Sequence, residues 1–278
     1  MSLFDAFRYD GKRVLVVGGA TGMGAAAAEL ALDAGAEVVV MDFAEVKLAG
    51  AKAIHVNLAE KDSIDKAVDE CGGPVHALMA CAGVADGTPG IEKINFAGHR
   101  HLIERMLSGG MLPRGASIGF ISSAAGLGWE ASWDLVKEYL DTPDFDSAAA
   151  WAQANGWADY FHSKQAICGY VAREAFHLLR DYGIRINAIC PGPTDTPLAQ
   201  ANAEMWLGFG ADFREEVGIE ASTPLEQAYA LVFLCSDAAA AISGQTLISD
   251  VGYIASGITG AFPPATPAAG FLLDRSWD

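Results

Sequence analysis

Short apolar runs alternate along this chain with longer segments whose apolar residues recur every three to four positions. Runs rich in Val, Ile and Ala predict buried strands, and a period near 3.6 predicts helices packed on one side. The predicted strands cover 13–19, 36–42, 51–57, 75–83, 116–123, 184–192 and 244–250. The predicted helices cover 22–35, 61–70, 91–108, 160–181 and 223–236.

Strands that alternate with helices are typical of βαβ units, which build a parallel sheet covered on both faces. The pattern therefore predicts an α/β fold with a single Rossmann-type, doubly wound parallel sheet of about seven strands and helices on both faces. No linker divides the chain, so we expect one domain over 1–278. Two segments extend this plan, a helical insertion at 124–158 and a C-terminal tail at 261–278 that docks on its own or a neighbouring subunit.

Composition narrows the range of partners. Hydrophobic residues make up 51% of the 278 residues, which is enough for a substantial core, and the formal net charge is -17. A phosphate backbone would be repelled by such a surface, so we expect no nucleic-acid partner. No apolar run approaches the roughly 18 residues of a membrane span, so we expect no membrane partner either.

The cysteine pattern and the N-terminus point to the cytoplasm. The five cysteines are scattered and form no CxxC pair, which argues against a zinc site or a disulfide framework and favours a reducing compartment. The first residues contain no apolar stretch typical of a signal peptide. His99 and His101 lie two positions apart on a predicted helix, where their rings point to different sides. We therefore expect solvated histidines and no metal site.

A glycine-rich turn follows the first predicted strand. The stretch "VGGATGMG" places Gly18, Gly22 and Gly24 between a strand and a helix. Glycines there allow the backbone to approach a pyrophosphate, whose negative charge is favoured at the start of the following helix. The turn thus indicates a dinucleotide-binding loop.

The second predicted strand ends in Asp42, which follows Gly24 by 18 positions. A carboxylate at this place can accept hydrogen bonds from both ribose hydroxyls of the adenosine and would repel a 2′-phosphate. Phe43, rather than a basic residue, comes next. This arrangement favours NAD over NADP as the cofactor, although an Asp at a strand end also serves simply to cap a turn.

Tyr160 and Lys164 are four positions apart, so they share one face of a helix about one turn from each other. The spacing alone is common, but further motifs accompany it in order. They are "VGGATGMG", "ACAG" (80–83), "INFAG" (94–98), "ISSAAG" (121–126), "YFHSK" (160–164), "PGPTDT" (191–196) and "SGQTLISDVG" (243–252). From about Arg13 to Gly252, this series resembles the short-chain dehydrogenase/reductase family.

The resemblance implies roles for individual residues. Tyr160 would be the general acid/base, and Lys164 with the positive nicotinamide would favour its phenolate and hold the ribose hydroxyls. Ser123 would donate a hydrogen bond to the substrate oxygen as negative charge develops on it. Asn95 would hold a water connecting Lys164 to solvent, unless it is a buried helix asparagine bonded to the backbone. The implied cofactor-binding residues are Gly18, Thr21, Gly22, Met23, Gly24, Asp42, Phe43, Asn57, Leu58, Cys81, Ala82, Gly83, Tyr160, Lys164, Pro191, Gly192, Thr194 and Thr196.

Four residues depart from the family's motifs. Val17 and Cys81 replace polar residues that usually join the first and fourth strands, and we expect apolar packing to substitute. Asn57 replaces the common aspartate that contacts adenine, and its amide still offers an acceptor and a donor. Val251 replaces a glycine near the C-terminal loop.

The 124–158 insertion separates Ser123 from Tyr160 by 37 positions, and it resembles the bacterial 3α-hydroxysteroid dehydrogenase/carbonyl reductase subgroup. It reads as two short helices around "DTPDFD". Four tryptophans fall within or beside it, namely Trp129, Trp133, Trp151 and Trp157. Either the insertion is a self-packed subdomain or subunit contact, or its aromatic rings cover the active site. In the second case they would lie beside Trp206 and Phe209, in the loop after "PGPTDT" where the family places its substrate lid. We expect a homo-oligomer, a dimer or tetramer, in which at least one of the four tryptophans reaches the substrate.

The functional expectation is an NAD-dependent oxidoreductase that interconverts a secondary alcohol and a ketone. Its substrate would be a small hydrophobic alcohol or ketone, in first place a bulky one such as a hydroxysteroid. One alternative is a dehydrogenase of a smaller aromatic or terpenoid alcohol. Another is a catalytically idle cofactor-sensing protein on the same fold, against which the intact set of Ser123, Tyr160 and Lys164 argues.

Overall fold

The computed structural model describes residues 2–276, in which seven strands form one sheet in the order β3-β2-β1-β4-β5-β6-β7. Every neighbouring pair runs parallel, which confirms the predicted doubly wound α/β class. The strands are β1 (Arg13–Val17), β2 (Glu37–Asp42), β3 (Lys52–His55), β4 (Ala77–Ala80), β5 (Ser117–Ile121), β6 (Arg185–Pro191) and β7 (Thr246–Ser249). Chain order reverses direction between β1 and β4, which creates the crevice where such sheets bind ligands.

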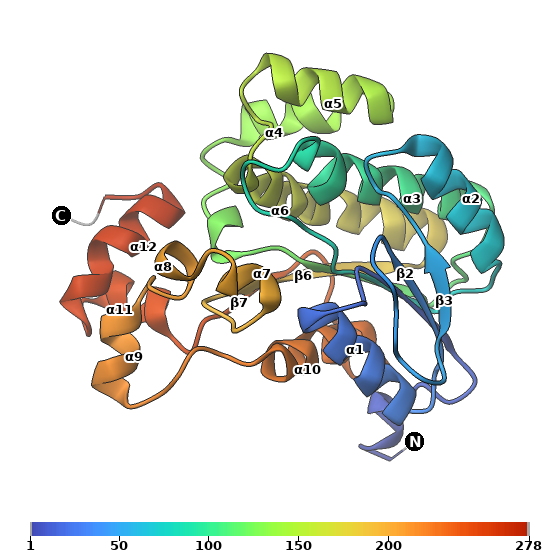
Figure 1. The fold of residues 1–278 in the computed structure, drawn as a ribbon, viewed down its shortest axis with the longest axis horizontal. Coiled ribbons are helices and arrows are strands. Elements are labelled where there is room, and N and C mark those ends of the chain that lie inside the picture. The colour runs from blue at the N-terminus through green and yellow to red at the C-terminus, as the bar shows by residue number, and fades with distance from the viewer. Residues whose placement is uncertain (1, 277–278) are drawn as a thin grey trace.

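Helices cover both faces of the sheet (Figure 1). One face carries α1 (Gly22–Asp33) and α10 (Pro224–Cys235), and the other carries α2 (Lys61–Cys71), α3 (Gly98–Ser108) and α6 (Tyr160–His177). Both faces are apolar because successive side chains of a strand point to opposite sides. In β1, for example, Val14 and Val16 belong to the core on one face, and Leu15 and Val17 belong to the core on the other.

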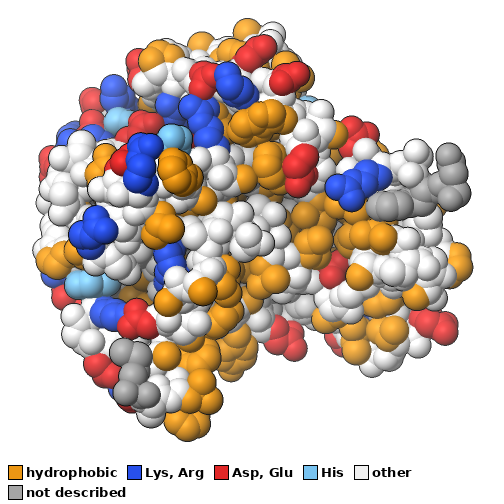
Figure 2. Space-filling view, turned by 180° about the vertical axis from the view of Figure 1, so that it is seen from behind, with side chains coloured by type: hydrophobic (Ala, Val, Ile, Leu, Met, Phe, Trp, Pro, Cys, Tyr) orange, Lys and Arg blue, Asp and Glu red, His pale blue; other side chains and the backbone are white. Residues whose placement is uncertain are grey.

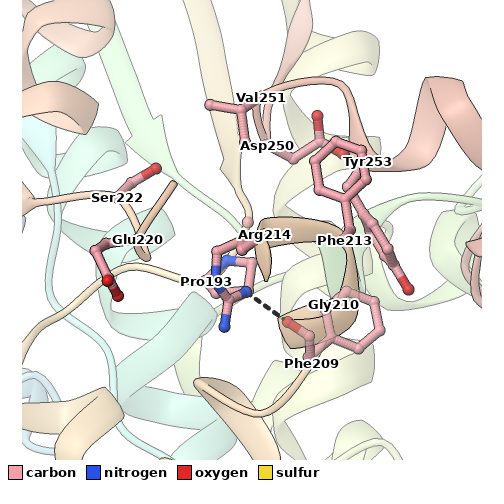
Figure 3. Close-up of a pocket in the computed structure, with 11 residues that line it drawn as sticks. Pro193, Phe209, Gly210, Phe213, Arg214, Glu220, Ser222, Asp250, Val251 and Tyr253 are labelled. Carbon is pink, nitrogen blue, oxygen red and sulfur yellow. Dashed lines mark hydrogen bonds between the residues drawn. The ribbon is translucent and has the colours of Figure 1, made fainter. Parts of the chain in front are cut away.

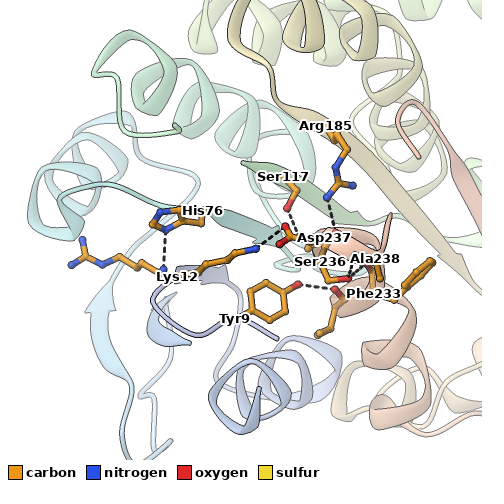
Figure 4. A network of polar contacts seen from close by, with 12 residues as sticks. Tyr9, Lys12, His76, Ser117, Arg185, Phe233, Ser236, Asp237 and Ala238 are labelled. Carbon is orange, nitrogen blue, oxygen red and sulfur yellow. Dashed lines mark hydrogen bonds and ion pairs between the residues drawn. The ribbon is translucent and has the colours of Figure 1, made fainter. Parts of the chain in front are cut away.

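The amino ends of the strands are closed by polar contacts to the last turn of α10 (Figure 4). The guanidinium of Arg185 donates to the carbonyls of Leu234 and Ser236, both at 2.8 Å. Ser117 Oγ donates to another carbonyl of the same turn at 2.6 Å. Because the last carbonyls of a helix have no partner within it, these bonds satisfy groups that would otherwise be buried unpaired. These contacts hold the amino ends of the strands in place. The functional site lies at the opposite, carboxyl ends.

The insertion folds into the two predicted helices, α4 (Trp133–Leu140) and α5 (Phe145–Ala154), which lie against the outer side of α3 and α6 (Figure 1). Its aromatic rings pack on one another. Tyr139 stacks on Trp151 with centroids 5.1 Å apart, and Trp151 meets Trp157 edge-on at 5.4 Å. The insertion is therefore a self-packed layer, which agrees with the first of the two interpretations drawn from the sequence.

Replacing Trp151 by Ala should reduce stability and leave substrate preference unchanged. The substitution removes the partner that stacks on Tyr139, and loss of a large packed aromatic costs about 2–3 kcal/mol. Urea unfolding measures the first effect, and the ratio of kcat/KM between a bulky and a small alcohol measures the second. Trp206→Ala is the matched control, because it should change that ratio. A changed ratio in Trp151→Ala would contradict the layer's purely structural role.

Two parts of the chain after β6, at 197–217 and 253–273, form a lobe of short helices that includes the C-terminal tail (Figure 1). The helices are α7 (Pro197–Gln200), α8 (Ala203–Trp206), α9 (Ala211–Val217), α11 (Tyr253–Thr259) and α12 (Thr266–Leu273). Helix α12 packs on α11 of the same chain, so the tail docks on its own subunit. Residues 277 and 278 of the predicted tail, like Met1, lie outside the described residues.

Val251 has a left-handed backbone conformation, with φ at 52°. A β-branched side chain disfavours this region, which explains why the family motif has glycine there. The side chain is 62% exposed, so it offers little packing in return. We expect Val251→Gly to raise the free energy of unfolding by about 1 kcal/mol, after the extra chain entropy of glycine is deducted. Chemical denaturation tests this, and a less stable variant would show that the strain is compensated.

The two histidines of α3 are buried, so the expectation of solvated histidines was wrong. His99 Nε2 lies 3.0 Å from the carbonyl oxygen of Ala82, and burial lowers the pKa of His99 to about 4. His101 Nε2 lies 2.9 Å from an Asp65 carboxylate oxygen. Helix α3 is enclosed by α2 and the sheet, which the local pattern did not reveal. Within 2–276 no cluster of potential metal ligands is found, and no helix is long and apolar enough to span a bilayer.

Candidate active site

A cavity of about 370 Å³ opens at the carboxyl ends of β1, β4, β5 and β6. Hydrophobic side chains gather where the C-terminal lobe meets the rest of the molecule (Figure 2). The cavity is lined by Met23, Cys81, Gly83, Asp86, Ile121, Ser122, Ser123, Ala124, Ala125, Tyr160, Phe161, Lys164, Pro191, Gly192, Pro193, Thr194, Thr196, Leu198, Ala199, Met205, Trp206, Phe209, Phe271 and Leu272. Parallel strands thus bring together residues from most of the sequence motifs.

The glycine loop packs closely against neighbouring backbone of the same chain. A Cβ on Gly18 would lie 2.3 Å from the backbone nitrogen of Ala82, and one on Gly24 would lie 1.9 Å from the carbonyl oxygen of Gly18. Only glycine fits at these two positions. Thr21 precedes α1 without capping it through its side chain, so the first amides of α1, starting at Gly22, remain available to an anion. This geometry fits the pyrophosphate of a dinucleotide.

Asp42 joins the glycine loop to the turn after β2. Its Oδ2 accepts a hydrogen bond from the amide of Ala20, and its Oδ1 accepts one from the amide of Ala44, both at 2.8 Å. The turn-capping alternative is thus seen in the structure. It does not exclude the ribose contact, because each carboxylate oxygen can accept more than one hydrogen bond. Phe43 is 70% exposed beside it and has no basic group to offer a 2′-phosphate.

Other predicted cofactor-binding residues are already bonded or packed within the chain. The Asn57 amide is engaged at the start of α2, where its Oδ1 accepts from the Ala59 amide and its Nδ2 donates to Glu60. Leu58 beside it is buried. The carbonyl of Val17 accepts the amides of both Cys81 and Ala82 at 2.8 Å. Backbone bonds and apolar packing therefore join β1 to β4 without the usual polar side chains.

The "PGPTDT" turn extends the cavity wall from the end of β6. Thr194 Oγ1 donates to the carbonyl of Gly192 at 3.0 Å, which tightens the turn. Thr196 Oγ1 accepts the amide of Ala199 at 3.1 Å and caps α7. Pro191 is the last residue of β6. The turn brings its polar atoms to the same cavity as Tyr160 and thereby fits the carboxamide-binding role that the motif implies.

Tyr160, Lys164 and Ser123 meet in the cavity wall. The Lys164 ammonium lies 5.4 Å from the centre of the Tyr160 ring and donates to the Ile121 carbonyl at 3.1 Å. Ser123 Oγ accepts the Ala125 amide at 3.2 Å. Burial raises the pKa of Tyr160 to about 12, opposed by a hydrogen bond from Ser123, and burial lowers the pKa of Lys164 to about 8. Burial therefore sets the direction of the Tyr160 pKa shift, and Lys164 is not among the groups that oppose it.

Asn95 lies in a π-helical turn (Lys93–Ala97) that leads into α3. Its Oδ1 accepts the amide of Val84 at 2.8 Å, and its Nδ2 donates to the Val84 carbonyl and to Ser163 Oγ, each at 3.1 Å. The backbone-bonded alternative is therefore the one observed. Both amide hydrogens are used, and the second lone pair of Oδ1 is the group left for a water.

Aromatic rings close the cavity opposite the Ser123–Tyr160–Lys164 group. The Trp206 ring lies 4.8 Å from the Tyr160 ring, and Phe209 lines the wall beside it, as expected for the lid. Phe161 and Phe271 meet at 5.7 Å. Sequence reasoning missed several wall residues, among them Phe161, Phe271, Leu272 and Asp86. The position of Asp86, three residues after the "ACAG" motif at the end of β4, was a usable signal.

None of the insertion's four tryptophans is among the residues that line this cavity. The expectation that at least one of them reaches the substrate is therefore wrong for this chain by itself. The physical reason is where the rings pack. Trp133, Trp151 and Trp157 pack on the core that includes α6, and Trp129 packs against Trp133 and the cluster around Leu127 and Cys168. The wall that it was expected to supply comes instead from the lid and from α12.

Comparison with known proteins agrees with this geometry. The family model described as short chain dehydrogenase matches residues 12–133, and the one described as Enoyl-(Acyl carrier protein) reductase matches residues 145–254. Cis-4-hydroxycyclohexanecarboxylate dehydrogenase of Sinomonas cyclohexanicum is 33% identical over 88% of this chain and 97% of its own length. Coniferyl-alcohol dehydrogenase of a Pseudomonas species is 28% identical over 87% and 96%.

A solved structure supports the resemblance to the hydroxysteroid subgroup. The 3-alpha-hydroxysteroid dehydrogenase from Pseudomonas sp. B-0831, complexed with NADH, has a TM-score of 0.71 and 26% identity, covering 90% of this chain and 99% of that one. The motifs, the sheet order and these matches lead to one assignment. The chain belongs to the short-chain dehydrogenase/reductase family.

Proposed function

We propose that this protein is an NAD-dependent oxidoreductase that interconverts a secondary alcohol and a ketone on an apolar substrate. The observation that carries the proposal is the meeting of Tyr160, Ser123 and Lys164 in the wall of a cavity otherwise lined largely by apolar side chains. A catalytically idle cofactor sensor would have no use for this acid/base group. Residues 2–276 share one sheet and its helices, which supports the proposal that the chain acts as a single domain.

The cofactor would be held by the glycine loop, Asp42, Lys164 and the "PGPTDT" turn, with the remaining motif residues around them. When bound, it supplies the hydride acceptor or donor. Asp42 supports NAD rather than NADP, since a second negative group beside its carboxylate would be repelled. Lys164 would hold the ribose hydroxyls of the nicotinamide half.

The chain's own residues would manage the proton and the substrate oxygen. Tyr160 takes the hydroxyl proton from the alcohol during oxidation and returns one during reduction. Ser123 donates a hydrogen bond to the same oxygen as charge develops on it. Asn95 holds the π-helical turn against Ser163 on α6 and leaves one acceptor site for water. The lid excludes solvent around these groups through Trp206 and Phe209.

Alcohol oxidation should accelerate with rising pH up to the pKa of Tyr160, whereas ketone reduction should stay level below that pKa and slow only above it. Oxidation needs the Tyr160 phenolate, and burial raises the pKa of this residue to about 12 in the free chain, so the phenolate is scarce near neutrality. Below the pKa of the cofactor complex, kcat/KM for oxidation should rise about tenfold per pH unit. Initial rates in both directions across the stable pH range check this. Parallel profiles in the two directions would point to another base.

The substrate we propose is a bulky hydrophobic alcohol or ketone such as a hydroxysteroid. The size of the cavity, the aromatic lid and the wall from α12 support it. A smaller aromatic alcohol stays as the alternative, because Trp206 could pack on a single ring and a coniferyl-alcohol dehydrogenase is among the relatives.

A panel of steroid, terpenoid and aromatic secondary alcohols tests the proposal. Oxidation is followed by the absorbance of the reduced nicotinamide, first with NAD and then with NADP. We expect the highest kcat/KM for a steroid alcohol with NAD. Binding of NAD without oxidation of any panel member would favour the sensor.

We further propose a homo-oligomer in the cytoplasm. All five cysteines are free thiols, which supports a reducing compartment. The insertion lies over the outer sides of α3 and α6, through which the family commonly pairs subunits, so we propose contacts elsewhere. The edge strand β7 and α10 offer exposed apolar residues such as Leu247 and Tyr229. Light scattering of the unmodified chain and of Tyr229→Lys tests this, since a monomer in the unmodified chain would overturn it.

A further inference from the structure

The cavity holds one negative and one positive side chain among the described residues that line it, Asp86 and Lys164. Lys164 is 4% exposed, and its ammonium is bonded to the Ile121 carbonyl beside the Tyr160 ring. Its charge thus belongs to the reacting end of the site. A charged group on the part of a substrate away from its reacting oxygen would find Asp86 as the charged side chain in the described wall, since Lys164 belongs to the reacting end.

Asp86 is fixed in position by the helix that carries Tyr160. Its Oδ1 accepts the backbone amide of Tyr160 at 2.7 Å, which satisfies one of the unpaired amides in the first turn of α6. Its Oδ2 accepts no hydrogen bond from the residues described, and no ion pair neutralises the carboxylate within 2–276. The carboxylate, which lines the cavity, therefore carries a negative charge that no side-chain cation of the described residues pairs with.

Two arginines of the C-terminal lobe do not offset this charge. Arg214 lies in a separate crevice behind the lid, where its guanidinium donates to the carbonyl of Phe209 at 2.8 Å and to that of Leu207 (Figure 3). Arg275 near the end of the tail is exposed and does not line the cavity. A carboxylate on a bound substrate would consequently lose water without gaining a partner.

We infer that Asp86 is a specificity-determining residue that favours uncharged or cationic alcohols and ketones over anionic ones at this site. The inference rests on the proposed oxidoreductase function and names its substrate class. It separates this chain from the relative named for cis-4-hydroxycyclohexanecarboxylate, whose substrate is an anion, despite 33% identity. Asp86 lies at the solvent-exposed mouth, so the discrimination should be moderate and sensitive to salt.

The test compares cis-4-hydroxycyclohexanecarboxylate with its methyl ester, by kcat/KM with NAD and by tryptophan-fluorescence titration of each compound onto the NAD complex. We expect an ester-to-acid ratio of about tenfold or more at low ionic strength, which shrinks as salt is added. Asp86→Asn keeps an oxygen for the Tyr160 amide and removes the charge, so it should lower the ratio severalfold. Glu138→Gln, which removes an exposed charge from α4, is the matched control and should leave the ratio unchanged.

Each outcome decides the point. Equal handling of acid and ester would overturn the inference, and so would an Asp86→Asn variant that changes both compounds by the same factor, since that result would reduce Asp86 to a positioning residue for Tyr160. Because binding is read independently, a chain that binds the ester more tightly but oxidises neither compound nor any other alcohol would overturn the proposed function and support this inference.

Discussion

Tyr160→Phe should lower kcat by about a thousandfold or more while NAD binds almost as before. The ring stays, so its contact with Trp206 at 4.8 Å and its place above Lys164 are kept. The hydroxyl is lost, and the other groups with exchangeable protons beside it are poor substitutes. The hydroxyl of Ser123 is too weakly acidic to yield a base near neutrality, and the Lys164 ammonium is bonded to the Ile121 carbonyl. Stopped-flow or steady-state oxidation of the best panel substrate measures the loss, and fluorescence titration measures NAD affinity.

Lys164→Ala is the informative companion of this variant. Lys164 has two proposed tasks, to hold the cofactor ribose and to support proton transfer by Tyr160, so its removal should weaken NAD binding as well as turnover. A pattern in which Tyr160→Phe retains near-normal turnover would assign the chemistry to another base or the protein to the sensor class. Ser123→Ala should reduce kcat less than Tyr160→Phe, because it removes one hydrogen bond rather than the proton-transfer group.

Asp42→Ala should narrow the preference of the protein for NAD over NADP, which we expect to be about a hundredfold in the unmodified chain. The carboxylate repels a 2′-phosphate, and no basic residue follows it to offset the repulsion. Dissociation constants for both oxidised cofactors, measured by fluorescence titration, give the ratio before and after the substitution. Equal affinity for the two cofactors in the unmodified protein would remove the basis of the NAD assignment.

The same variant should also be less stable, by about 1–2 kcal/mol, because Asp42 accepts the amides of Ala20 and Ala44. A loosened glycine loop would weaken both cofactors alike, so the affinity ratio and not the affinity is the decisive quantity. Asp42→Asn serves as the control. It removes the charge but keeps one oxygen for an amide, and should change the ratio with a smaller loss of stability.

The order of the elements and the reacting group could be predicted from the sequence because they depend on local signals. The five inner strands are buried on both faces and therefore read as continuous apolar runs. The edge strands β3 and β7 are short and partly exposed, but their positions in the alternation of strands and helices still predict them. The glycine loop and the spacing of Tyr160 and Lys164 express constraints within a few residues of each other. Strand and helix ends were less exact, as for the helix predicted at 91–108, which contains a π-helical turn before α3 begins at Gly98.

The tertiary structure decided what lies around the reacting group. Tryptophans such as Trp151 carry no local mark that distinguishes a ring on a cavity wall from a ring packed on Tyr139. His99 likewise carries no local mark of its burial within α3, where it meets the Ala82 carbonyl. Phe271 reaches the cavity only because α12 docks on α11, a contact between segments far from the catalytic motifs in sequence. Asp86 is set beside Tyr160 by the meeting of the β4 loop with α6. Such neighbours are created by long-range packing, and the sequence pattern near each residue does not encode them.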